Sequence, residues 1–251
     1  MAKPMAAMPT QPRSDAELLQ ANRQFYEALW TDARLVRPER FNTWPLLGAL
    51  AARSPRRLEV APGLRPRLPI DGTHFVDISA AALTRLRRSG ASTVLGLITS
   101  IPFRSETFDL VCALDIVEHV DDEDAALSEL SRVAARGATL VLSVPLHPSR
   151  WSAFDEFVGH RRRYEPERLL SKLSEHAISV ERSAVYGMRP RCSRLVELGM
   201  WWLTHHRERA MWWYNRVFMP FGLRLQKPLA FASGMLDAAK ADELLLVCRK
   251  W

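Results

Sequence analysis

The chain has 251 residues, and its hydrophobic share of 47% and charged share of 25% are those of an ordinary soluble protein with a sizeable core. No apolar run reaches the ~20 residues that a membrane-spanning helix requires. Pro and Gln interrupt the first thirteen residues, where a signal peptide needs a continuous apolar stretch. We therefore expect a cytoplasmic protein without a transmembrane segment.

The charge and the cysteines limit the partners further. A formal net charge of +7 leaves a nucleic-acid partner open, but the basic residues are spread along the chain with one dense cluster at 161–163, so nucleic acid is the less favoured partner. Three scattered cysteines, Cys112, Cys192 and Cys248, argue against a disulfide framework and a cysteine-based metal site. The neighbouring histidines at 205–206 would diverge on a helix, so we expect no metal.

Helices are predicted at the beginning of the chain. We expect residues 1–13 to be disordered, because this stretch is short, contains proline and lacks periodicity. Ser14 and Glu17 then form a capping box that opens a helix. A second helix is predicted over 46–52, and the segment 14–55 would form an N-terminal helical lid.

Strands and helices alternate after this lid. The predicted strands cover 58–61, 75–78, 93–98, 109–114, 139–144, 177–185 and 243–248, and the predicted helices cover 81–88, 123–135 and 166–175. This alternation predicts an α/β fold with a mostly parallel sheet and helices on both of its faces. We see no internal repeat and no linker, so we expect a single domain over 1–251 with its core in 56–187 and 243–251.

One segment, 188–236, interrupts the alternation before the last strand. Four of the eight tryptophans fall within thirteen residues of it, namely Trp201, Trp202, Trp212 and Trp213. We interpret the segment as a helical cap insertion whose aromatic side chains either pack on the sheet or bind an apolar acceptor. Nearby arginines also make it compatible with peripheral contact with a membrane surface.

The first site pattern runs from Arg57 to Asp77. It consists of a strand, a glycine-containing turn and a second strand that ends in an acidic residue. Such a turn lets backbone N–H groups approach a nucleotide-like cofactor, and a carboxylate can bind its ribose hydroxyls. Asp77 follows Glu59 by 18 positions, close to the spacing of about 20 in such units. The pattern therefore predicts a nucleotide-like cofactor beside Gly63.

Further motifs follow this pattern in a fixed order. They are Ile101-Pro-Phe103, Phe108-Asp-Leu-Val111, Asp115-Ile-Val-Glu-His-Val120 and Leu140-Val-Leu-Ser-Val-Pro145. Together with the glycine turn, they resemble the class I S-adenosylmethionine-dependent methyltransferases, in particular the type 11-like small-molecule group. The resemblance covers 57–187 and, less closely, 243–248. It implies a Rossmann-like fold with an antiparallel last strand, S-adenosyl-L-methionine as the cofactor, and methyl transfer to an oxygen or nitrogen of a small or medium-sized acceptor.

The resemblance also implies roles for individual residues. Glu59 would contact the methionine portion of the cofactor, Asp77 would accept hydrogen bonds from both ribose hydroxyls, and Gly63 would let the backbone pass close beneath the cofactor. Asp115 and Ile116 would lie beside the methyl-bearing sulfur. The implied cofactor contacts are Glu59, Ala61, Pro62, Gly63, Arg65, Asp77, Ile78, Ile98, Asp115, Ile116 and His119.

Two departures from the family pattern bear on cofactor binding. The usual Gly-x-Gly-x-Gly reads Ala61-Pro-Gly63-Leu-Arg65, and Arg65 would compensate by binding the cofactor carboxylate. Leu97 stands where an acidic residue often binds the adenine amino group, so adenine recognition would rest on backbone groups near Ile98. These departures leave open a non-catalytic relative that uses the fold for binding, and the charge leaves open a nucleic-acid methyltransferase.

A second constellation, 155–164, resembles the Gly-His-x-Arg-Arg-Tyr run of some type 11-like sequences. His160 would act as a general base on a hydroxyl or amine acceptor, since an imidazole pKa near ~6.5 suits that task. An arginine of this run would bind a carboxylate or phosphate of an anionic acceptor. The implied acceptor contacts are Tyr26, Arg162, Arg163, Tyr164, Trp201 and Trp202. The alternative is a loop tied by its arginines to nearby acids, with His160 simply hydrogen-bonded.

Overall fold

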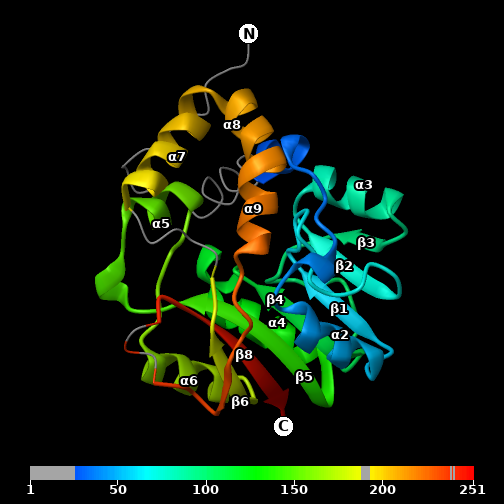
Figure 1. Cartoon of the computed structure of the whole chain (residues 1–251). Helices are drawn as coiled ribbons and strands as arrows, with labels where there is room; N and C mark the ends of the chain where they lie inside the picture. The colour runs from blue at the N-terminus through cyan, green and yellow to red at the C-terminus, as the bar shows by residue number, and fades with distance from the viewer. Residues whose placement is uncertain (1–25, 188–192, 238, 240) are drawn as a thin grey trace.

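A single sheet lies at the centre of the molecule, and helices lie on both of its sides (Figure 1). The computed structural model describes residues 26–187, 193–237, 239 and 241–251. Within this part of the chain, eight strands form one sheet in the order β3-β2-β1-β4-β5-β8-β6-β7. The strands β3, β2, β1, β4 and β5 are parallel, whereas β8 pairs antiparallel with both β5 and β6, and β7 with β6. The expected mostly parallel sheet with an antiparallel last strand is confirmed.

The strands follow the predicted segments closely. They are β1 (Arg57–Val60), β2 (Thr73–Asp77), β3 (Ser92–Leu95), β4 (Phe108–Leu114), β5 (Ala134–Pro145), β6 (Ile178–Val185), β7 (Phe231–Ser233) and β8 (Glu243–Lys250). The sequence did not predict β7, which lies in the segment that we expected to be helical. It is a three-residue edge strand paired to β6, too short to show a period of two.

The helices include several short ones that the sequence did not predict. The longer helices are α2 (Trp44–Ala52), α3 (Ala80–Arg88), α4 (Glu123–Val133), α5 (Ala153–Val158), α6 (Pro166–Glu175), α7 (Ser193–His205), α8 (Arg207–Trp213) and α9 (Met219–Arg224). The single turns are η1 (Pro38–Arg40), η2 (Val117–His119) and η3 (Pro148–Arg150), and η4 (Tyr214–Phe218) is a π-helical turn. Residues 26–32 are also helical. The expected disorder of 1–13 and the capping box at Ser14 and Glu17 lie outside the described residues.

Strand β4 shows why both faces of the sheet are covered. Its side chains alternate between faces, and nearly all are buried. Leu110 and Cys112 belong to the cluster with α2, whereas Val111 and Ala113 belong to the larger cluster with α4 and α6. A continuous apolar run is the pattern of a central parallel strand.

Side-chain caps fix where two of the helices begin. The Ser79 side chain accepts a hydrogen bond from the Ala82 N–H at the start of α3, directly after β2. Asp122 does the same for the Ala125 N–H of α4. Such caps satisfy N–H groups that have no partner within the helix. The helix after β2 therefore begins three residues beyond Asp77, at the carboxyl edge of the sheet.

The Trp-rich insertion forms an arch of helices α7, α8 and α9 above the sheet (Figure 1). Leu203, Met211 and Tyr214 of this arch pack with Trp30 and Leu64. Among the described residues, no helix is long and apolar enough to cross a lipid bilayer.

Candidate active site

Three neighbouring parallel strands each end next to a residue with a strained backbone. Ala61 follows β1 with a φ of +56°, Asp115 follows β4 with +53°, and His147 lies just beyond β5 with +60°. A non-glycine residue adopts this left-handed region at a cost, and such strain concentrates at functional sites. Ligands of open α/β sheets bind at this same edge. The carboxyl ends of β1, β4 and β5 are therefore where we place the site.

Asp77 lies at the end of β2 and its carboxylate touches the glycine turn. One oxygen accepts from the Gly63 N–H at 2.9 Å and the other from the Ser79 N–H at 2.8 Å. Burial raises the pKa of Asp77 from 3.8 to about 6, although these backbone N–H groups oppose the shift. Each oxygen has a second lone pair, so the carboxylate can still accept from a ligand. Its ribose-binding role stays a prediction.

Glu59 is bound by the loop that follows the turn. Its carboxylate accepts hydrogen bonds from the backbone N–H groups of Arg67 and Leu68 at 2.8–3.0 Å. Burial raises its pKa from 4.5 to about 7, because the ionised form is poorly solvated there. In this structure Glu59 holds the loop in place, and its predicted contact with the methionine portion of a cofactor stays a prediction.

Arg65 is a cation held between aromatic rings. Its guanidinium carbon lies 5.6 Å from the centre of the Trp30 ring and 5.1 Å from that of Tyr214. It forms no ion pair with any described residue, and burial lowers its pKa from 12.5 to about 10. A positive charge without a carboxylate partner remains available for a ligand carboxylate, which is the role that the sequence predicts for it.

Acidic side chains gather on the other side of the site. The Ser143 hydroxyl donates to the Asp115 carboxylate and accepts from the Asp115 N–H at 2.8 Å. Glu243 opens β8 opposite Pro145, and its Oε1 is buried without a partner. Burial, followed by the nearby Asp115 carboxylate, raises the pKa of Glu243 well above its ordinary value. The sequence analysis missed Glu243, although an acid at the first position of an antiparallel last strand must lie at this edge.

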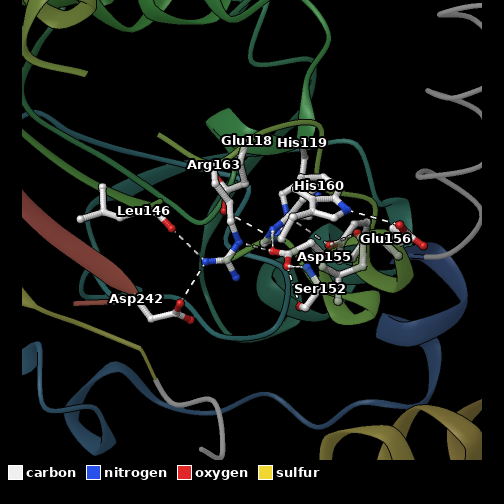
Figure 2. A network of polar contacts seen from close by, with 12 residues as sticks. Glu118, His119, Leu146, Ser152, Asp155, Glu156, His160, Arg163 and Asp242 are labelled. Atoms are coloured by element: carbon white, nitrogen blue, oxygen red, sulfur yellow. Dashed lines mark hydrogen bonds and ion pairs between the residues drawn. The ribbon is translucent and has the colours of Figure 1, made fainter. Parts of the chain in front are cut away.

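Asp155 organises the second constellation (Figure 2). Its Oδ1 lies 2.9 Å from both His160 Nδ1 and Arg163 Nε, and its Oδ2 accepts from the backbone and hydroxyl of Ser152. Burial alone would raise the pKa of Asp155, but these hydrogen bonds hold it well below its ordinary value. The fully buried Asp155 carboxylate therefore fixes the orientation of the His160 ring.

His160 lies beside two residues of η2. Its Nε2 is 3.8 Å from Glu118 Oε1, and its ring meets that of His119 edge to face at a centroid distance of 4.7 Å. The Arg161 N–H donates to the Glu118 carbonyl at 2.7 Å, which ties the two segments together. Burial and the neighbouring His160 lower the pKa of His119 to about 3. The structure thus brings together His119 and His160, which the sequence analysis assigned to different ligands, and adds Glu118.

Arg162, Arg163 and Tyr164 are engaged with the surrounding framework. Arg162 donates to the carbonyls of residues 120 and 121 and pairs with Glu123. Arg163 is buried and bonds to Asp155, to the Leu146 carbonyl and to Asp242 (Figure 2). The Tyr164 hydroxyl donates to Glu123 at 2.8 Å. These are the contacts expected of a loop tied to nearby acids, and the acceptor-binding roles of the three residues stay predictions.

The helix over 26–32 contacts both the glycine turn and the 155–164 segment. Trp30 packs against Gly63, and the Glu27 carboxylate accepts from the Ser79 hydroxyl at 2.6 Å and from the Ala81 N–H at 3.0 Å. The Tyr26 hydroxyl donates to the Val158 carbonyl at 3.2 Å and lies 3.5 Å from His119 Nε2. These contacts place Tyr26 beside the 155–164 segment, and its roles in a lid and in acceptor binding both stay predictions.

The remaining predicted contacts are apolar. Pro62 and Ile98 are buried, Ile116 packs at the edge of the main core, and Ile78 directly follows Asp77. Trp201 is 51% exposed and stacks on His205, whereas Trp202 meets Trp213 and Phe218 of the neighbouring helical turns. The acceptor-binding roles of both tryptophans stay predictions.

Parts of this chain are similar to known methyltransferases. Residues 69–142 match the family described as "Methyltransferase domain", type 11. The chain is 40% identical over 48 residues to norajmaline N-methyltransferase of Rauvolfia serpentina, which is 19% of this chain and 16% of that protein. It is 41% identical over 59 residues to demethylmenaquinone methyltransferase of Streptomyces avermitilis, which is 24% of this chain and 25% of that protein.

A solved structure extends the likeness to the whole fold. A Thermotoga maritima protein described as an S-adenosylmethionine-dependent methyltransferase, "possible histamine N-methyltransferase", aligns over 94% of this chain and 95% of its own, with a TM-score of 0.56 and 13% identity. The chain spans between 16% and 56% of the length of the curated relatives that it matches. The sheet order and the strained strand ends thus belong to a ligand-binding α/β fold. More particularly, residues 69–142 match the type 11 methyltransferase domain, and the chain as a whole has the fold of a known S-adenosylmethionine-dependent methyltransferase.

The charges of the site fit the cofactor that this domain implies. S-adenosylmethionine carries a carboxylate, an ammonium and a sulfonium. Arg65 provides a cation without an ion pair, and Glu243 provides a buried carboxyl oxygen without a partner. Asp77 provides acceptors at the end of β2, as the ribose of such a cofactor requires. Among the described residues, Arg65 thus suits the cofactor carboxylate, Glu243 suits a cationic group, and Asp77 suits the sugar.

Proposed function

We propose that this protein transfers the sulfonium methyl group of S-adenosyl-L-methionine to an oxygen or nitrogen of a small or medium-sized acceptor. The observation that carries the proposal is the pairing of two sites at one sheet edge. Arg65, Asp77 and Asp115 suit the cofactor, and His160, oriented by Asp155, lies beside the η2 turn that follows Asp115.

The cofactor supplies a methyl carbon that is activated by positive sulfur. Asp77 would hold its ribose and Arg65 its carboxylate, so that this carbon is held in place for attack from the acceptor side. Asp115 would stabilise the positive charge with its carboxylate, and the neighbouring Glu243 carboxyl would offer an oxygen as a hydrogen-bond acceptor, since both lie at the carboxyl edge of the sheet. The bond from the acceptor atom to carbon forms while the carbon–sulfur bond breaks.

His160 would take the proton that a hydroxyl acceptor loses. Its Nδ1 faces the Asp155 carboxylate, which accepts only, so the lone pair is left on Nε2. That atom points toward Glu118 and His119 rather than into the framework. The same base would be dispensable for a neutral amine acceptor. We also propose a cytoplasmic location, because Cys112 and Cys248 are buried free cysteines in the core.

We also propose that the protein binds an anionic membrane surface through its helical arch and methylates its acceptor there. The arch of α7 to α9 exposes large apolar side chains that are 38% to 63% accessible, namely Leu195, Leu198, Trp201, Trp212, Trp213, Val217, Phe218, Phe221 and Leu225. Basic side chains are exposed on the same helices or just beyond them, namely Arg194, Arg209, Arg216, Arg224 and Lys227. Aromatic and aliphatic groups bordered by arginines are typical of a helix that lies in the headgroup region of a bilayer.

Vesicle sedimentation tests this surface. We expect binding to vesicles that contain anionic phosphatidylglycerol, weaker binding to neutral phosphatidylcholine, and loss of both in the double variant Trp212→Ser, Phe221→Ser. Trp151→Ser is the matched control, because Trp151 is 40% exposed but lies outside the arch. Equal sedimentation of all three proteins would reject the membrane surface, and concentration-dependent dimerisation lost in the double variant would assign the face to a second copy of the chain.

Calorimetric titration with S-adenosylmethionine and S-adenosylhomocysteine is the first test of the activity itself. Micromolar binding of both, followed by transfer of a labelled methyl group in an acceptor screen, is the expected result. A folded protein, free of co-purified ligand, that binds neither would instead favour a non-catalytic binding protein. Binding to nucleic acid that weakens steeply with salt would favour a nucleic-acid methyltransferase.

A further inference from the structure

Three side chains at the junction of η2 and the 155–164 loop converge on one point. Glu118, His119 and His160 each offer one ligand atom, and these atoms lie within 4.8 Å of one another. Glu118 is 1% exposed, and its Oε2 has no hydrogen-bond partner among the residues that the structure describes. His119 Nδ1 is likewise buried without a partner. Figure 2 shows the three side chains gathered next to the Asp155 network.

The hydrogen-bond partners decide which atoms of the two rings are free. Asp155 Oδ1 lies 2.9 Å from His160 Nδ1, and because a carboxylate only accepts, we assign the proton to Nδ1 and the lone pair to Nε2. His119 has the opposite arrangement. Its Nε2 side faces the Tyr26 hydroxyl at 3.5 Å, whereas its Nδ1 is the unpartnered atom.

The converging groups are therefore two imidazole lone pairs and the buried Glu118 carboxyl group. Burying polar groups without a partner is costly. A positive ion at their centre would satisfy all three at once. We propose that Glu118, His119 and His160 form a binding site for a divalent transition-metal ion of the Zn²⁺ or Co²⁺ type.

The donor types favour this class of ion. Imidazole nitrogens together with one carboxylate suit zinc and its neighbours, whereas magnesium and calcium prefer oxygen donors throughout. Three protein ligands leave further positions open for water or another ligand. Asp155 plays the supporting part that metal-bound histidines usually have, because it accepts from the other ring nitrogen of His160 and fixes its tautomer.

An ion at this point has a consequence for the proposed methyl transfer. It would occupy His160 Nε2, which is the atom that would otherwise take the acceptor's proton, so the two uses exclude each other. We expect added Zn²⁺ to lower turnover with a hydroxyl acceptor. This consequence rests on the proposed function, whereas ion binding itself does not.

Titration of the chelator-treated protein tests the site directly. We expect one Co²⁺ per chain to bind with micromolar affinity, seen by its visible absorption, and Zn²⁺ to displace it. His160→Ala should weaken binding at least tenfold. His176→Ala should leave binding unchanged, because His176 lies at the surface beside Asp124, away from the cluster. No binding by the wild type, or equal affinity in all three proteins, would overturn the proposal.

Nuclear magnetic resonance of the histidine ring nitrogens gives a test that needs no variant. On addition of Zn²⁺ to the wild-type protein, the resonances of His160 Nε2 and His119 Nδ1 should shift, and those of the surface histidines should not. A shift confined to other histidines would overturn the assignment. Because this readout is independent of S-adenosylmethionine, failure here leaves the proposed methyl transfer to be judged by its own titration.

Discussion

The Trp30 ring packs directly against the backbone of Gly63. A Cβ built on Gly63 would lie 2.2 Å from Trp30 Cζ2 and 2.4 Å from Cε2, far inside a normal contact, and the glycine has a φ of +53°. Only glycine can both adopt this positive φ and leave room for the Trp30 ring without a cost in free energy. The helix over 26–32 is therefore seated on the turn that the sequence assigns to the cofactor.

We expect Gly63→Ala to lower the free energy of unfolding by about 2 to 4 kcal/mol. Roughly 1 kcal/mol comes from the positive φ, and the rest from displacement of the Trp30 ring, since overpacking typically costs about 1–3 kcal/mol. Gly234→Ala is the matched control, because Gly234 has a φ of +64° with nothing within 4 Å of its Cβ position. If denaturant unfolding shows that both variants lose the same free energy of unfolding, the contact with Trp30 does not account for the loss.

Asp77→Ala should weaken S-adenosylmethionine binding at least tenfold, which corresponds to about 1.4 kcal/mol and is reasonable for lost charge-assisted hydrogen bonds. Calorimetry on the folded variant measures it. The variant also frees the Gly63 and Ser79 N–H groups, so its unfolding must be recorded alongside. An unchanged affinity would reject Asp77 as the ribose ligand.

The same affinity should depend on pH. Burial raises the pKa of Asp77 from 3.8 to about 6, so the carboxylate that accepts from ribose becomes protonated as the pH falls below that value. We expect the dissociation constant to increase about tenfold between pH 7 and pH 5. Asp77→Asn cannot titrate and should give a flat profile, and a wild-type profile just as flat would contradict the assignment.

Arg65 should be specific for the carboxylate of the cofactor. We expect the wild type to bind S-adenosylmethionine more tightly than its decarboxylated analogue, and Arg65→Met to bind the two alike, because the guanidinium has no other anionic partner among the described residues. Titrations of both proteins with both ligands give four dissociation constants. The ratio of the two ligand affinities in the wild type, divided by the same ratio in Arg65→Met, measures the coupling between Arg65 and the carboxylate. A preference that survives in Arg65→Met would place the carboxylate elsewhere.

His160→Ala should leave cofactor affinity intact and lower turnover with a hydroxyl acceptor by about 10²- to 10⁴-fold, the usual contribution of general base catalysis. Single-turnover transfer of a labelled methyl group separates this loss from product release. His176→Ala serves as the control. Normal turnover in His160→Ala would reject general base catalysis by His160 and leave it a structural, hydrogen-bonded residue.

Glu59 should make stability depend on pH in an unusual direction. Burial raises its pKa from 4.5 to about 7, so between these values the folded protein keeps a proton that the unfolded chain releases. Its contribution is therefore full below pH 4.5 and is lost as the pH rises through 7. We expect the stability difference between wild type and Glu59→Gln to fall by about 1 to 3 kcal/mol over this range. A difference that rises with pH would contradict the burial of Glu59.

The sequence predicts the sheet well because its central strands are long apolar runs between clear turn residues. β4 and β8 match their predicted segments within a few residues, and α6 matches at both ends. Short elements are not predicted, because they lack such a long pattern. β7 has three residues and α5 has six, and neither is long enough to show a period.

The site was only partly predictable, because motifs mark residues along the chain and not their partners. Asp77 and Gly63 could be paired in advance, since a known unit fixes their spacing. Glu243 lies far along the chain from Asp115, and only the antiparallel pairing of β8 with β5 brings them together. Likewise, nothing in the local sequence shows that His160 would meet His119, which belongs to another loop.

The helix over 26–32 has consequences for the order of events in turnover. Through Glu27 it holds the start of α3, through Trp30 it covers the glycine turn, and through Tyr26 it reaches the carbonyl of Val158 next to the second constellation. One helix therefore contacts both binding regions and couples the opening of one to that of the other. We expect steady-state kinetics of a compulsory-order type, with the spent cofactor leaving last.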